Sequence, residues 1–312
     1  MSRRGWVLFA LMSVIWGIPY LLIKIAVEGV SVPVVVFART AIGAAVLLPL
    51  ALRGRSAGGP MGLVAELRPY WKPLLAFATI EMIVPWWLLS DAERRISSSM
   101  AGLIIAAVPV LAVVTSRLVG DTERLSGTRW SGLALGFAGV AVLVSPELGG
   151  GQPGAIVEVL LVAVCYATAP LIAARRLNDV PALPMTAACL GFAALLYAPA
   201  AIVTWPDTTP SGQVLAALAA LAVICTAIAF IVFFALIREV GPSRALVFTY
   251  VNPAVAVTAG VLVLDEPLTG TIIASFVLII VGSILATARQ RATEPAGAEP
   301  ARQPVSAQVD CR

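Results

Sequence analysis

Apolar residues follow one another along this chain in long runs, and each run ends at a cluster of charged residues, proline or glycine. A helix needs roughly 20 apolar residues to cross the hydrocarbon core of a bilayer, and these runs are of that order. The pattern therefore predicts an all-α integral membrane protein with ten spanning helices. The expected spans are residues 6–25, 33–52, 73–90, 98–118, 129–145, 154–174, 183–204, 212–237, 244–264 and 269–288.

The composition agrees with a lipid environment. Of the 312 residues, 60% are hydrophobic and only 12% are charged, whereas a soluble domain carries about 25% charged residues. A soluble protein could not bury so much apolar surface, and ten spans leave no room for a sizeable soluble domain. Histidine is absent and the four cysteines show no metal or redox spacing. We therefore predict no cofactor and no metal.

The basic residues are distributed unevenly between alternate connections. With the N-terminus placed inside the cell, 17 of the 21 Lys and Arg residues fall in cytoplasmic segments. Only Arg94 and Arg95 fall in an outer loop, while Lys24 and Arg39 belong to spans. This bias predicts a multi-pass protein of the cell membrane with both termini in the cytoplasm. It also explains the basic charge balance without any nucleic-acid partner.

The two halves of the chain resemble each other. Residues 97–121 align with residues 241–265 at a fixed spacing of 144. The positions that recur include Ser99, Ala101, Pro109 and Asp121, found again as Ser243, Ala245, Pro253 and Asp265. Five spans in each copy is an odd number, so the second copy is expected to be inverted in the membrane. Inverted repeats with broken helices are typical of secondary transporters.

These motifs resemble those of a known transporter family. The residues that carry the resemblance are Trp16-Gly17 with Lys24, then Pro109 with Glu123-Arg124-Leu125-Ser126, and the second-half echo Pro253 with Asp265-Glu266-Pro267-Leu268-Thr269. Over about residues 6–288 the chain is similar to the EamA family of the drug/metabolite transporter superfamily. The resemblance implies two inverted five-helix repeats around a central cavity, and export of amino acids or related metabolites.

The expected organisation follows from this repeat. Residues 1–145 form the first five-helix repeat, 146–153 a linker loop, and 154–288 the second repeat. The tail over 289–312 is rich in Ala, Pro, Glu, Gln and Arg, which predicts disorder in the cytoplasm. Because both inverted repeats lie within one chain, the working unit is expected to be a monomer or a homodimer. The other expected partners are the lipid bilayer and a small-molecule substrate.

Glu81 is the first candidate for chemistry. Counted from Pro73 at 1.5 Å per residue, it lies about 12 Å into the membrane core. A charge at that depth costs roughly 2.5–3.5 kcal/mol, so the carboxylate should face a cavity or a cation. It would then accept a proton or bind a substrate amine. The alternative is a neutral Glu81 whose hydrogen bond merely packs two helices.

Two cations lie within the first two predicted spans. Arg39 and Lys24 could bind a substrate carboxylate or pair with Glu28 or Glu81. The alternative for both is that the long side chain extends to the membrane interface.

A second group of candidates surrounds prolines inside spans. Trp16 with Pro19 and Tyr20 predicts a kinked segment that lines the cavity, or else ordinary helix packing. Tyr250, Asn252 and Pro253 fall in the middle of the ninth span, and Pro109 takes the related place in the fourth. Paired breaks of this kind expose backbone carbonyls to cargo in transporters, although ordinary kinks would look the same. A further set of Trp and Tyr residues near span ends is expected at the two membrane interfaces, and it comprises Trp6, Tyr70, Trp71, Trp86, Trp87, Trp130 and Trp205.

The function that these patterns favour is a secondary transporter that exports small metabolites. Multidrug efflux is the alternative within transport. An intramembrane enzyme is a different class, but the chain has no HExxH, no GxSxG and no adjacent nucleophile and base. A scaffold is also disfavoured, because it would not need broken helices at matching positions. We therefore expect no enzymatic activity.

Overall fold

Helices make up almost all of the computed structural model, which describes residues 2–53, 59–120, 125–148 and 151–287; the described residues contain no strand. The first half comprises α1 (Arg3–Ile15), α2 (Pro19–Ala26), α3 (Val32–Arg53), α4 (Gly59–Leu67), η1 (Arg68–Tyr70), α5 (Trp71–Ala78), η2 (Thr79–Ile83), α6 (Val84–Ala92), α7 (Ser98–Ile105), α8 (Val108–Leu118) and α9 (Gly127–Leu148). The second half comprises α10 (Pro153–Arg176), α11 (Ala182–Val203), α12 (Gly212–Ala222), η3 (Val223–Ile228), α13 (Ala229–Val240), α14 (Pro242–Ala245), η4 (Leu246–Tyr250), α15 (Asn252–Leu264) and α16 (Gly270–Ala286). The expected tail over 289–312, and Glu123 and Arg124 of the family motif, lie outside the described residues.

Eight helical stretches are long and apolar enough to cross a membrane, and they coincide with the first eight predicted spans. The last two predicted spans contain the shorter apolar helices Asn252–Leu264 and Gly270–Ala286. The prediction of an all-α membrane protein is therefore confirmed. The count of ten and the inverted arrangement remain predictions. The connection after α3 contains a further helix, α4, because its apolar run is long enough for more than two turns.

Three of the expected helix breaks are present, each with a proline at the start of the second piece. The chain leaves helical geometry before Pro19, before Pro109 and before Pro253. Proline has no N–H to donate, and it fits the first helical turn, where that hydrogen bond is missing anyway. By contrast, Pro170 lies inside the continuous helix α10. The first spans of the two halves therefore differ, since only the first is broken.

The third and eighth predicted spans share a second irregularity. A π-helical turn occupies residues Thr79–Ile83, and another occupies Val223–Ile228. The two turns begin 144 residues apart, the spacing that aligns the fourth and ninth spans. Helices α8 and α15 also begin 144 residues apart. Because π-turns are rare and concentrate at functional sites, this coincidence supports the internal repeat.

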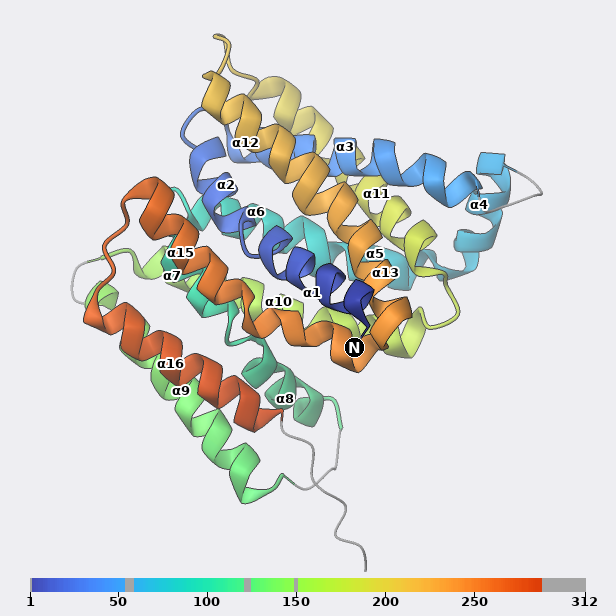
Figure 1. Ribbon diagram of the computed structural model, residues 1–312. Coiled ribbons are helices and arrows are strands. Elements are labelled where there is room, and N and C mark those ends of the chain that lie inside the picture. The colour runs from blue at the N-terminus through green and yellow to red at the C-terminus, as the bar shows by residue number, and fades with distance from the viewer. Residues whose placement is uncertain (1, 54–58, 121–124, 149–150, 288–312) are drawn as a thin grey trace, which may run out of the picture.

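The closest helix pairings join corresponding elements of the two halves. Helix α3 packs along α11, and α9 packs along α16 at the other side of the molecule (Figure 1). The α9–α16 crossing depends on glycine, because a Cβ on Gly132 would lie 2.3 Å from the Ala286 nitrogen. A Cβ on Gly282 would lie 2.4 Å from the Gly136 nitrogen. Small residues let membrane helices approach in this way, as expected for packing.

Candidate functional site

Arg39 is buried inside the bundle, at 8% exposure. Its Nε donates to the Thr226 hydroxyl at 2.9 Å, and its guanidinium carbon lies 3.7 Å from the centre of the Trp86 ring. The predicted pairs with Glu28 or Glu81 do not form in the described part of the chain. A π-face stabilises a cation without neutralising it. The guanidinium therefore keeps its positive charge and lacks a carboxylate partner among the described residues.

Tyr166 of α10 lies near this cation and near a carboxylate. Its hydroxyl lies beside the Trp86 indole and within electrostatic range of both Arg39 and Glu81. Glu81 is half-buried in the π-turn η2, and its carboxylate makes no hydrogen bond or ion pair in the described structure. The structure thus brings two predicted site residues of opposite charge within electrostatic range of one phenol.

The polar path continues from Arg39 toward one end of the bundle. Tyr20 of α2 is buried and lies within electrostatic range of Tyr166, Arg39 and Glu93. Glu93 follows the last residue of α6 and is fully buried. We call the end of the bundle that contains Glu93 and the start of α7 the Glu93 end.

Lys24 of α2 also lies at the Glu93 end. Its ammonium donates to the backbone oxygens of Glu93, at 2.6 Å, and Ile96, at 2.9 Å. The side chain is therefore bound by backbone oxygens of the connection between α6 and α7. A cation at these carbonyls is favourable, because α6 ends here and its dipole is negative at that end. A cavity of 210 Å³ lies against this contact and is lined by Lys24, Val27, Glu28, Glu93 and Arg94.

Glu266 ties the second half of the chain to the first at the same end. Its carboxylate accepts hydrogen bonds from the backbone nitrogens of Ser98, at 2.7 Å, and Ser99, at 3.0 Å, and from both serine hydroxyls. These groups lie at the N-terminus of α7, where free N–H groups and the helix dipole stabilise an anion. We call Glu266, Ser98 and Ser99 the Glu266 clasp.

The backbone before α16 brings Glu266 to the clasp. Asp265 is left-handed, with φ of 52°, a conformation that Asp tolerates better than most side chains. The turn lets the Glu266 nitrogen donate to the Gly260 oxygen at 3.2 Å. A Cβ on Gly260 would lie 2.3 Å from a Glu266 carboxylate oxygen, so glycine is required for this approach.

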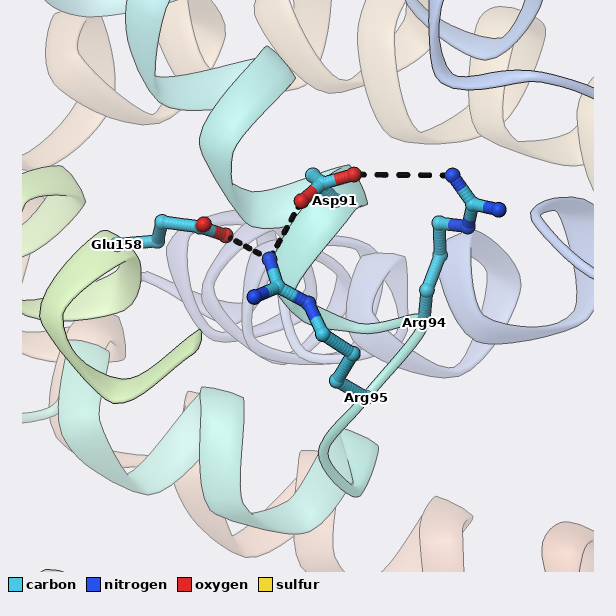
Figure 2. A network of polar contacts seen from close by, with 4 residues as sticks. All are labelled: Asp91, Arg94, Arg95 and Glu158. Atoms are coloured by element: carbon cyan, nitrogen blue, oxygen red, sulfur yellow. Dashed lines mark hydrogen bonds and ion pairs between the residues drawn. The ribbon is translucent and has the colours of Figure 1, made fainter. Parts of the chain in front are cut away.

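A third contact at this end is an exposed ion network, shown in Figure 2. Arg95 donates to Glu158 of α10 at 2.6 Å and also to Asp91, while Arg94 lies 3.7 Å from Asp91. The hydrogen bond that Arg95 donates to Glu158 raises the pKa of the Arg95 guanidinium, so it stays charged throughout the physiological range. The network connects the end of α6 to the start of α10.

The other predicted site residues lie in a separate group. Trp16 stands at the break between α1 and α2, and its ring packs against Phe230, Phe233 and Phe248, with centroids 5.0–5.9 Å apart. With its amide nitrogen turned toward two carbonyls, Asn252 donates to the oxygens of Ser13 and Phe248 at 3.1 Å. The kink at Trp16 is confirmed, and its ring belongs to an aromatic cluster.

Tyr250 ends the 3-10 turn η4 in front of Asn252 and Pro253. Its hydroxyl pairs with the Thr287 hydroxyl. The break at Pro253 is thus supported by backbone oxygens of α1 and η4 and by the contact between the Tyr250 and Thr287 side chains.

Sequence reasoning missed several residues of this site. Trp86 was expected at a membrane interface, yet it is buried and lies against Arg39 of another helix. Glu93 was missed because it lies after the end of α6, where no pattern in the sequence indicates that it is buried. Ser98 and Ser99 offered one signal, a run of serines directly before an apolar helix. Within the described residues, no group of His, Cys, Asp or Glu side chains could hold a metal ion.

Comparisons with known proteins agree with this architecture. The model of the EamA-like transporter family matches residues 3–145 and again residues 154–288. The uncharacterized inner membrane transporter YedA of Escherichia coli K12 is 30% identical over 298 residues, which cover 90% of this chain and 92% of YedA. The uncharacterized transporter YvbV of Bacillus subtilis 168 is 26% identical and covers 95% of each chain. One crystal structure is 21% identical with a TM-score of 0.64, covering 92% of this chain and 98% of its own, and shows the shared fold.

Proposed function

This chain belongs to the EamA-like transporter family, and from that premise we propose that it exports small zwitterionic metabolites, such as amino acids, across the cell membrane. Relatives named as transporters match it over nearly its whole length, which is consistent with a protein that moves substrates and does not transform them.

The observation that carries the proposal is the pair of opposite charges, Glu81 and Arg39, within electrostatic range of Tyr166. A free amino acid has an ammonium and a carboxylate, and each needs a partner of opposite sign when water is removed. Glu81 supplies the carboxylate for the cargo ammonium, and Arg39 supplies a cation without an acidic partner for the cargo carboxylate. An Arg fork also binds a carboxylate through two parallel hydrogen bonds.

The proposed mechanism is alternating access between two inverted repeats. The unequal distribution of basic residues supports cytoplasmic termini, which place the Glu93 end outside the cell. In the structure, the Glu266 clasp and the Lys24 contacts hold the Glu93 end together. Cargo would enter from the cytoplasm, bind between Glu81 and Arg39, and leave once these contacts separate. The membrane potential offers about 2.3 kcal/mol per charge at 100 mV to drive the cycle.

A second candidate cargo is a hydrophobic cation. The cluster of Trp16, Phe230, Phe233 and Phe248 offers π-faces that attract such compounds. This alternative predicts efflux that depends on the aromatic rings and not on Arg39, since a cation gains nothing from a guanidinium.

The test compares extracellular metabolites from cells that express wild type, Glu81→Gln, Arg39→Lys or empty vector. Asp179→Asn serves as the matched control, because it neutralises an exposed carboxylate. We expect a zwitterion to accumulate outside with wild type and the control and to fall at least tenfold with either site variant. Accumulation by all variants would keep the exporter and reject the charge pair. Efflux of cationic dyes alone would support the second candidate.

A further inference from the structure

Glu93 is the least satisfied acidic side chain of the described structure. Its exposure is 0%, and both carboxylate oxygens lack a hydrogen-bond donor. An ionised carboxylate without donors is strongly disfavoured in a site closed to water. The protonated carboxyl has no such penalty and can occupy the same place.

The groups around Glu93 come from three elements, and none neutralises it by direct contact. Helix α2 contributes Lys24 and Tyr20, α3 contributes Arg39, and the chain before α16 contributes Glu266. Lys24 lowers the electrostatic cost, but its hydrogen bonds go to backbone oxygens. Arg39 donates to Thr226 and lies over Trp86, as described above.

Two further features oppose ionisation of Glu93. Glu266 is a neighbouring carboxylate, and like charges repel. Glu93 caps the C-terminus of α6, where the helix dipole is negative. The charged residues Glu28 and Arg94 line the adjoining cavity, and both are exposed, so water screens them. Burial therefore raises the pKa of the Glu93 carboxyl well above its usual value.

We propose that Glu93 is a proton-binding site that is occupied while the Glu93 end is closed, and that loss of this proton opens that end. The charged carboxylate would draw in water and separate α6 from α2 and α7. This proposal rests on the proposed function for its meaning: a proton taken up from outside would close the outer end and return an empty exporter to the cytoplasmic side. Glu81 would then hold cargo and Glu93 the coupling proton, which would pass to the cytoplasmic side before the outer end opens again.

The first test measures thermal unfolding of the purified full chain in lipid nanodiscs between pH 5 and pH 9. A carboxyl whose pKa is higher in the folded state stabilises the fold at low pH, and this stability is lost as the pH rises through the folded pKa. We expect the wild-type Tm to fall by about 3 °C per pH unit over the range in which Glu93 is protonated in the folded state and ionised in the unfolded state. Glu93→Gln, which is permanently neutral, should remove this fall, and Glu93→Met serves if the Gln variant is not recovered. The control Glu28→Gln changes an exposed carboxyl of the same cavity and should keep the wild-type profile.

The second test measures opening. A cysteine is placed at buried Ile96 or at exposed Arg94, and its modification by a water-soluble maleimide is followed by peptide mass spectrometry. The ratio of Ile96→Cys to Arg94→Cys labelling cancels the effect of pH on thiol reactivity. We expect this ratio to rise at least fivefold from pH 5 to pH 9 with Glu93 present and to stay low with Glu93→Gln.

Parallel pH profiles of wild type and Glu93→Gln in the unfolding test would overturn the proton site. A labelling ratio independent of pH would overturn its link to opening. Both measurements are made without cargo, so they can succeed or fail independently of the export assay with Glu81→Gln. If export of a zwitterion is absent and both profiles still depend on Glu93, the proton site stands and the proposed cargo is wrong.

Discussion

Two buried carboxylates lie at the same end of this bundle and are satisfied in opposite ways. Glu266 accepts hydrogen bonds from two backbone nitrogens and two hydroxyls at a helix N-terminus. Glu93 follows a helix C-terminus and has no donor within the described structure. A helix start stabilises a negative charge and a helix end destabilises it. One position therefore suits a permanent anion, and the other suits a group that gains and loses a proton.

The largest expected effect comes from removing the satisfied carboxylate. Glu266→Ala leaves the N–H and hydroxyl groups of Ser98 and Ser99 buried without an acceptor, which should destabilise the protein by about 3 kcal/mol or more. Thermal unfolding in nanodiscs measures the loss. The matched control Glu239→Ala removes a carboxylate that is exposed enough to be hydrated, at 25% of its side chain. Equal stability of the two variants would contradict the structural role of the clasp.

A smaller loss is expected from crowding the clasp. The new Cβ of Gly260→Ala would lie within 2.8 Å of three oxygens, those of Glu266, Ser99 and Ser98. Overpacking of this kind costs about 1–3 kcal/mol, and here it should also displace the carboxylate. The control Gly270→Ala has open space around its Cβ. If the two variants unfold at the same temperature, the close approach of Gly260 to the clasp is not real.

Lys24→Met sharpens the comparison from the other carboxylate. The variant loses two hydrogen bonds to backbone oxygens, which should cost about 1–2 kcal/mol. The positive charge of Lys24 holds the pKa of Glu93 lower than burial alone would set it. Without this charge, the fall of Tm with pH should extend to higher pH. The same change in a Glu93→Gln background should leave the profile flat, and a shift there would assign the effect to another group.

The smallest effect is expected from the exposed network of Figure 2. Arg95→Ala breaks contacts with Glu158 and Asp91 that water already screens, so the loss should be below about 1 kcal/mol. It should also shrink as salt is raised. Unfolding at low and high ionic strength measures both. A salt-independent loss of stability larger than that of Lys24→Met would show that the ion network acts together with the buried carboxylates Glu93 and Glu266.

The sequence was sufficient for the spans and the helix breaks, because both depend on local chemistry. Apolar runs of membrane length predicted the helical stretches, and prolines marked the breaks before Pro19, Pro109 and Pro253. Contacts between distant segments could not be predicted in the same way. Glu266 accepts a hydrogen bond from Ser98, which is 168 residues away in the sequence, and no local pattern near either residue predicts this contact.

The two predicted cations illustrate the same limit. Arg39 and Lys24 were recognised as charges within spans, but their partners were not predicted. Arg39 contacts Thr226 and Trp86, and Lys24 donates to backbone oxygens. Every residue has a backbone oxygen, so the sequence does not show which one will accept. Glu93 was missed because it follows the end of α6, and burial of a carboxyl after a helix end depends on contacts with distant segments.

The paired π-turns bear on how this gene arose. A π-turn arises when one residue is inserted into an α-helix, an event that normally destabilises the helix and is removed by selection. Two independent insertions at equivalent places in the two halves are far less economical than one insertion that was later copied. The turns at Thr79–Ile83 and Val223–Ile228 therefore have the positions expected if one insertion preceded a duplication, so that each half of the present chain carries a copy of the same irregularity.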